Sequence, residues 1–140
     1  MLSAMIPQLA EVKFLGSDQP FSGTIRLHRA VLPSAVAAFA EIEAAGLKDR
    51  ILSFDGAYVL RTVRGSSSKL SAHGLGTAFD LNCQWNSIRK PAAEIGQQGS
   101  LKELVPIFEK HGFRWGGTLP RPDPCHFEFK TQQDEEPAMP

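Results

Sequence analysis

Two short segments of this chain carry His and acidic residues in a pattern typical of metal ligands. The first is Ser71–Asp80, in the sequence SAHGLGTAFD, and the second is Asp123–Glu128, in the sequence DPCHFE. His73, Asp80 and His126 offer two imidazoles and one carboxylate, which are ligands that zinc accepts. A three-ligand set leaves the fourth tetrahedral position open to water, as catalytic zinc sites require. The pattern therefore predicts a catalytic zinc centre.

The residues around these ligands suit a crowded site. Gly74 and Gly76 let the backbone turn sharply between the first two ligands. The run Ala78–Leu81 predicts a strand that carries Asp80 on one face. Pro124 favours an extended backbone at Asp123, so that this carboxylate can hold a water beside the metal. A single His or Asp of this kind is more often a surface or core residue, and it is the combination that is specific.

The two segments resemble the signatures of the M15 peptidases. This family comprises zinc enzymes that cut peptidoglycan stem peptides, including D-alanyl-D-alanine carboxypeptidases, dipeptidases and phage L-alanyl-D-glutamate endopeptidases. The second signature is an acidic residue, any two residues and a His, and Asp123 and His126 match it. The acid is Asp in the phage endopeptidase branch and Glu in the dipeptidase branch, so this chain resembles the phage branch more. The likeness spans roughly residues 25–130. The first signature, S-x-H-x-x-G-x-A-x-D, is matched at Ser71, His73, Gly76, Ala78 and Asp80.

The resemblance implies roles for individual residues. It implies that His73, Asp80 and His126 hold Zn²⁺, and that Asp123 takes a proton from the attacking water and returns it to the leaving amine. Arg61 lies where the family places an arginine that polarises the scissile carbonyl. The substrate implied is a peptidoglycan stem peptide, cut by an endopeptidase of the endolysin type or by a D-alanyl-D-alanine carboxypeptidase.

Four further residues are candidates for binding substrate or supporting a ligand. Glu128 shares a strand face with His126, so it either hydrogen-bonds that ligand, binds substrate or is a strand-edge carboxylate. Arg64 is an alternative to Arg61 and a candidate for binding a substrate carboxylate, and either arginine could instead form a loop salt bridge. Ser71 belongs to the first signature. Trp115 either walls the substrate groove or is part of the core.

The two cysteines are predicted to lie behind the site. If the strands are regular, alternation places Cys125 opposite His126, and Cys83 opposite both Asp80 and Asn82. Both thiols then face the apolar side, where buried packing is the usual role of a free Cys. A disulfide remains open if the two strands are neighbours.

The hydrophobic pattern predicts an α+β fold, a small antiparallel sheet with flanking helices. A helix opens at Pro33 and ends near Gly46. A second begins at a capping box formed by Ser100 and Glu103, bends at Pro106 and stops at Gly112. We expect an M15-like domain over residues 1–130 and a polar tail over residues 131–140. The predicted strands are residues 24–31, 57–63, 78–81 and 125–130.

Composition limits the functional classes. With 15 basic and 15 acidic residues the formal charge is zero, and without Asp134, Glu135 and Glu136 the body has 15 against 12, a net +3. This small excess does not suggest nucleic-acid binding. We find no apolar run of about 18 residues and no basic n-region, so we expect no membrane span and no signal peptide. We expect a monomer that stays cytoplasmic until release and then acts on the cell wall or periplasm.

Two other classes stay open. A non-catalytic, zinc-containing wall-binding module needs no base, and Asp123 argues against it. A zinc-stabilised structural module of a phage particle would close the fourth metal position with a Cys or His. Cys125 is the adjacent candidate, but its predicted facing opposes that role.

Overall fold

The computed structural model describes residues 9–13, 24–57 and 77–130. Two predictions, the strand over 57–63 and the polar tail, lie outside these residues apart from Ala57. Within the described part, no helix is long and apolar enough to cross a membrane. The elements are β1 (Leu9–Lys13), β2 (Thr24–His28), α2 (Leu32–Ala44), β3 (Phe54–Gly56), β4 (Ala78–Leu81), α3 (Val105–Lys110), β5 (Phe113–Trp115) and β6 (His126–Phe129).

A four-stranded antiparallel sheet is the centre of the fold. Its strand order is β3-β4-β6-β5, and β1 and β2 form a separate antiparallel pair. In the register between β4 and β6, Asp80 lies directly opposite His126. In the register between β5 and β6, Arg114 lies opposite Glu128. The predicted α+β class, a small antiparallel sheet with flanking helices, is confirmed.

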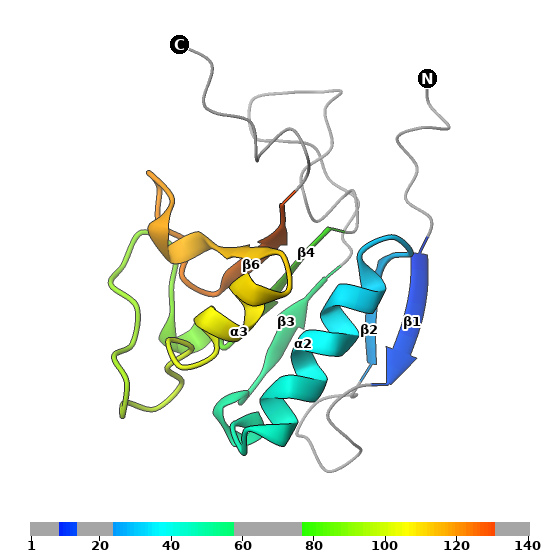
Figure 1. Cartoon of the computed structure of the whole chain (residues 1–140). Helices are drawn as coiled ribbons and strands as arrows, with labels where there is room; N and C mark the ends of the chain where they lie inside the picture. Colours follow the sequence, from blue (N-terminus) through cyan, green and yellow to red (C-terminus); the bar gives the residue numbers. More distant parts are fainter. Residues whose placement is uncertain (1–8, 14–23, 58–76, 131–140) are drawn as a thin grey trace, which may run out of the picture.

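Aromatic side chains from one face of the sheet form the core. Phe79 on β4 and Phe127 on β6 are completely buried, and their rings stack at a centroid distance of 5.7 Å. Both rings also contact Phe108 of α3, and Phe79 contacts Phe39 of α2. The two helices therefore cover this face, as Figure 1 shows. Because strand residues alternate, burying Phe79 and Phe127 turns Asp80 and His126 to the opposite face.

Helix α2 begins and ends as the sequence predicts. Pro33 lies in its first turn, where a missing N–H costs no hydrogen bond. At the other end Gly46 has φ +74°, and the N–H of Leu47 donates to the carbonyl of Ile42 at 3.0 Å. This is the hydrogen-bond pattern of a Schellman motif, which favours Gly at the left-handed position.

Helix α3 is shorter than predicted. It spans Val105–Lys110, so Pro106 lies in its first turn and does not bend its interior. The hydroxyl of Ser100 accepts from the N–H of Lys102 at 3.3 Å and donates to the carbonyl of Ala93 at 3.0 Å. It stabilises the loop before the helix, and residues 102–104 form turns. The prediction of a helix starting at Ser100 is therefore wrong.

Two predicted strands are also shorter in the structure. β2 ends at His28 because the chain turns there, with the N–H of Val31 donating to the carbonyl of His28 at 2.9 Å. β6 covers His126–Phe129, so Cys125 precedes the strand. This difference at Cys125 changes which side of the sheet its thiol faces.

Candidate metal centre and active site

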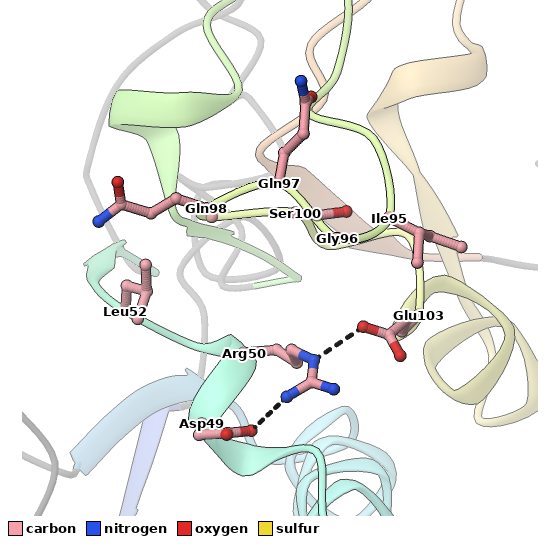
Figure 2. Close-up of a pocket in the computed structure, with 10 residues that line it drawn as sticks. Asp49, Arg50, Leu52, Ile95, Gly96, Gln97, Gln98, Ser100 and Glu103 are labelled. Atoms are coloured by element: carbon pink, nitrogen blue, oxygen red, sulfur yellow. Dashed lines mark hydrogen bonds and ion pairs between the residues drawn. The ribbon is translucent and has the colours of Figure 1, made fainter.

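A cavity of about 510 Å³ lies between residues 49–52, which follow α2, and residues 95–100 in the loop before α3 (Figure 2). Arg50 crosses its floor, with ion pairs to Glu103 at 2.7 Å and Asp49 at 2.8 Å. None of the residues lining it is a candidate from the sequence. Of the described residues that line it, the one cation, Arg50, is already paired with both carboxylates, so the chemistry of the cavity does not indicate catalysis. It is lined by Asp49, Arg50, Leu52, Glu103 and residues 95–100.

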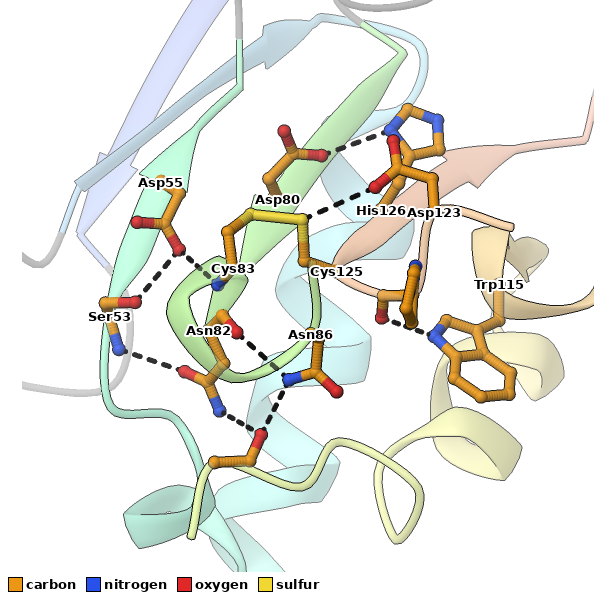
Figure 3. The surroundings of a disulfide bond; sticks show 12 residues. Ser53, Asp55, Asp80, Asn82, Cys83, Asn86, Trp115, Asp123, Cys125 and His126 are labelled. Atoms are coloured by element: carbon orange, nitrogen blue, oxygen red, sulfur yellow. Dashed lines mark hydrogen bonds and ion pairs between the residues drawn. A yellow bond between two sulfur atoms is a disulfide. The ribbon is translucent and has the colours of Figure 1, made fainter. Parts of the chain in front are cut away.

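The polar face of the sheet carries a close carboxylate–imidazole pair. Oδ1 of Asp80 lies 3.1 Å from Nδ1 of His126, across the β4–β6 register (Figure 3). Two ligands each about 2 Å from a tetrahedral zinc are about 3.3 Å apart. The spacing of Asp80 and His126 therefore fits a shared metal ion.

The other nitrogen of the same ring is held by a second carboxylate. Nε2 of His126 lies 2.7 Å from Oε1 of Glu128, and Oε2 of Glu128 accepts from the guanidinium of Arg114 at 2.7 Å. Metal-binding histidines usually donate their second ring N–H to a carboxylate, which fixes the tautomer. With Nε2–H donating to Glu128, Nδ1 is the ring nitrogen that faces Asp80 and is available to a metal ion. The contact with His126 is one of the three interpretations of Glu128 that the sequence left open, and its role in supporting a metal ligand stays a prediction.

The site favours a positive charge at His126. Burial lowers the pKa of His126, but hydrogen bonds and charges from Asp80 and Glu128 outweigh burial and raise that pKa from 6.5 to about 9. The hydrogen bond from His126 lowers the pKa of Glu128 against its burial, and Arg114 lowers it further, from 4.5 to about 2. The carboxylates that stabilise a proton here also favour a divalent cation in its place.

A tight turn positions Asp123 ahead of His126. The carbonyl of Asp123 accepts from the N–H of His126 at 3.0 Å, and the N–H of Asp123 donates to the carbonyl of Gly116 at 2.9 Å. A Cβ at Gly116 would lie 2.3 Å from the Asp123 carbonyl oxygen, so only glycine permits this approach. The indole N–H of Trp115 donates to the carbonyl of Pro124 at 2.7 Å. The half-buried Trp115 thus packs on the core and fixes the turn.

The cysteines form a disulfide beside the metal pair. Cys83 and Cys125 are bonded, with their Cα atoms 4.9 Å apart. Ligand atoms of Asp80, Cys83 and Cys125 all lie within 4.8 Å of one another. The prediction that both thiols lie behind the site is therefore wrong. It assumed regular strands, whereas Cys125 precedes β6 and Cys83 follows the left-handed Asn82, whose φ is +52°.

Asn82 is an important residue that sequence reasoning placed incorrectly. It does not share a face with Asp80 but is completely buried. Its side-chain oxygen accepts from the N–H groups of Leu52 and Ser53, and its amide donates to the carbonyls of Arg50 and Gly99. These bonds fasten the end of β4 to two loops. The signal available was Asn at a strand end, since Asn tolerates the left-handed conformation better than most residues.

Four predicted site residues lie outside the described part of the chain, namely Arg61, Arg64, Ser71 and His73. The structure therefore brings together Asp80, Asp123, His126 and Glu128, with Trp115 beneath them. His73 as third metal ligand and Arg61 as carbonyl-polarising group remain predictions.

Comparison with known families agrees with this geometry. Residues 64–129 match a model of the M15 peptidases whose description is D-alanyl-D-alanine carboxypeptidase. This segment belongs to the M15 peptidase family. The M15 segment includes both signatures and the strands β4, β5 and β6, whereas Arg61 precedes it. No curated protein matches the chain. The match supports a peptidase function in general, of the class that acts on peptidoglycan, for the segment that it covers.

Proposed function

We propose that this M15 peptidase depends on zinc and hydrolyses peptidoglycan stem peptides, with His73, Asp80 and His126 as metal ligands. The observation that carries the proposal is the 3.1 Å pair of Asp80 and His126, with Glu128 on the far nitrogen of the imidazole. When bound, zinc supplies a Lewis acid that polarises a carbonyl oxygen and acidifies water. The residues around the ion then direct that chemistry.

Asp123 is the proposed general base. It accepts a proton from the attacking water and gives it to the leaving amine, since its carboxylate is held by a rigid turn next to the ligand His126. Glu128 holds Nε2–H of His126 and so leaves Nδ1, which faces Asp80, as the nitrogen available to the metal ion. Arg61 stabilises the negative charge that develops on the carbonyl oxygen. Arg64, Ser71 and Trp115 are proposed to shape or support the substrate site.

The proposed bond is L-alanyl-D-glutamate, as in phage endolysins. The Asp at position 123 supports this choice, since the phage branch that the chain resembles has Asp before its second His ligand. We further propose that the protein is a monomer that accumulates in the cytoplasm and reaches the wall when the membrane is breached.

A D-alanyl-D-alanine carboxypeptidase is the second candidate, and the description of the matching family model favours it. Such an enzyme needs a cation for the terminal carboxylate of its substrate. Arg114 is already bound to Glu128, so Arg64 is the better candidate for that contact.

A metal-stabilised, non-catalytic module is the alternative of another class. Structural zinc sites use four protein ligands. In the oxidised chain both cysteines are consumed by their disulfide, which supports an open, catalytic metal position.

Product analysis tests the proposal and separates the three candidates. Purified peptidoglycan is incubated with the protein, with and without a chelator, and new termini are identified by mass spectrometry. We expect chelator-sensitive cleavage between L-Ala and D-Glu. Release of free D-Ala with that bond intact would replace the endopeptidase by the carboxypeptidase. Absence of any cleavage by zinc-loaded protein would contradict a peptidase function.

A further inference from the structure

The disulfide Cys83–Cys125 lies against a residue of the proposed metal centre. The two sulfur atoms and a carboxylate oxygen of Asp80 lie within 4.8 Å of one another. Sulfur of Cys125 is also 3.6 Å from Oδ1 of Asp123. Two sulfur atoms thus lie beside a carboxylate oxygen. While the sulfurs are bonded to each other, only the carboxylate of these three can bind a metal ion.

The backbone holds both cysteines there independently of the S–S bond. The N–H of Cys83 donates to a carboxylate oxygen of Asp55 at 2.9 Å, and this oxygen also accepts from the hydroxyl of Ser53. The carbonyl of Cys125 accepts from the N–H of Leu81 at 2.9 Å, next to Asp80. None of these hydrogen bonds involves a sulfur atom, so cleaving the S–S bond removes none of them, and we expect both thiols to stay beside Asp80.

We propose that reduction of this disulfide creates a thiolate metal site from Asp80, Cys83 and Cys125. Two sulfurs on one tetrahedral zinc lie about 3.8 Å apart, a separation that side-chain rotation supplies once the bond is cut. His126 is the proposed fourth ligand: its Nδ1 is 3.1 Å from the carboxylate of Asp80, but it is not among the ligand atoms that lie within 4.8 Å of one another, so its side chain must move toward the sulfurs. Zinc and cobalt(II) are the ions that such a sulfur, nitrogen and oxygen set takes.

The chemistry balances with a thiol or phosphine reductant. Two electrons cleave the S–S bond and two protons give two thiols, while a dithiol is oxidised to its disulfide or a phosphine to its oxide. Binding of a divalent ion then releases both thiol protons. The result is a closed four-ligand site, which differs from the open site that hydrolysis needs.

One consequence rests on the proposed function. The thiolate site and the hydrolytic site share Asp80 and His126. The two sites therefore cannot hold metal ions at the same time. Thiols stay reduced in the cytosol and pair in oxidising compartments. The reduced chain is therefore held inactive. Exchange with a disulfide oxidant, which is itself reduced to its dithiol, re-forms the Cys83–Cys125 bond, removes the sulfur ligands and leaves Asp80 and His126 to the hydrolytic site.

Cobalt(II) spectroscopy of the full chain tests the site without relying on activity. Metal-free protein is prepared oxidised and phosphine-reduced, the thiols are counted, and folding is checked by circular dichroism. We expect intense thiolate-to-cobalt absorption in the near ultraviolet for the reduced protein alone. The band should weaken in Cys83→Ser and in Cys125→Ser, and Asp80→Ala should lower cobalt affinity. A folded, reduced chain with two free thiols but no such band would overturn the proposal.

His73→Ala separates this site from the proposed hydrolytic one. In the reduced variant the thiolate band should persist, because His73 is not among its ligands. Loss of the band there would contradict the assignment. Failure of the oxidised parent to hydrolyse peptidoglycan would count against the proposed function alone, since the cobalt spectrum does not depend on hydrolysis.

Discussion

Glu128 binds Nε2 of His126 at 2.7 Å, so that Nδ1 of the same ring faces Asp80. The adjacent residues Phe79 and Phe127 stack in the core on the other face of the sheet. The packing of the core therefore sets the register that pairs a carboxylate with an imidazole. Glu128, one step along β6 on the same face, fixes which nitrogen is available.

Glu128→Gln should weaken zinc binding without unfolding the protein. The amide can still accept from Nε2–H, but it carries no charge and no longer pairs with Arg114. Loss of such a partner typically lowers metal affinity by about 10–100-fold. Competition with a chromophoric chelator measures the change. Glu109→Gln on the exposed surface of α3 is the matched control, and equal affinities for the two variants would contradict the role of Glu128.

Gly116→Ala should displace the turn that carries Asp123 and His126. The new Cβ would lie 2.3 Å from the Asp123 carbonyl oxygen and 3.0 Å from Cβ of His126, so the turn must move. Hydrolysis and zinc affinity should both fall. Gly46→Ala is the control, because its Cβ meets nothing within 4 Å and its φ of +74° costs stability alone. A Gly116→Ala protein with unchanged hydrolysis would show that the turn tolerates displacement.

Asn82→Ala should destabilise the fold more than any surface substitution. It removes four hydrogen bonds and leaves the buried carbonyl of Gly99 and the half-buried backbone groups of Arg50, Leu52 and Ser53 with fewer partners. We expect a loss of about 2–4 kcal/mol in the free energy of unfolding. Urea denaturation measures it, with the exposed Gln84→Ala as control. A loss no larger than that of the control would refute the role of Asn82.

The metal-free protein should lose stability above neutral pH. The pKa of His126 is raised from 6.5 to about 9, so its contribution is complete below 6.5 and disappears as pH rises through 9. The pKa of Glu128 is lowered from 4.5 to about 2, so its contribution is complete above 4.5 and disappears as pH falls through 2. Stability of the chelator-treated protein, measured by urea denaturation, should be highest between these limits. His126→Gln should flatten the alkaline side, and a parent whose stability increases from pH 6.5 to 9 would contradict the assignment.

Sequence alone was sufficient where the strands are regular. Alternation along residues 78–81 and 126–129 correctly placed Asp80, His126 and Glu128 on one face. It did so because buried Phe79 precedes Asp80, and buried Phe127 lies between His126 and Glu128. The same rule failed at Cys83 and Cys125, which lie just outside the strands. No local pattern revealed the left-handed turn at Asn82 or the turn at 123–126, since both depend on contacts with distant loops. Pro106 fixed the start of α3 rather than bending it, because proline is readily accommodated in a first turn.

Paired measurements of zinc content and hydrolysis on Asp80→Ala and Asp123→Asn test the central claim most directly. Asp80→Ala should lose zinc and activity together, because a metal ligand is gone. Asp123→Asn should retain zinc but lose about 10²–10⁴-fold in hydrolysis, since an amide cannot accept the proton of water. Asp49→Asn, at an exposed position, should match the parent in both. An Asp80→Ala protein with full zinc content, or an Asp123→Asn protein that cleaves stem peptides at the parental rate, would contradict the account.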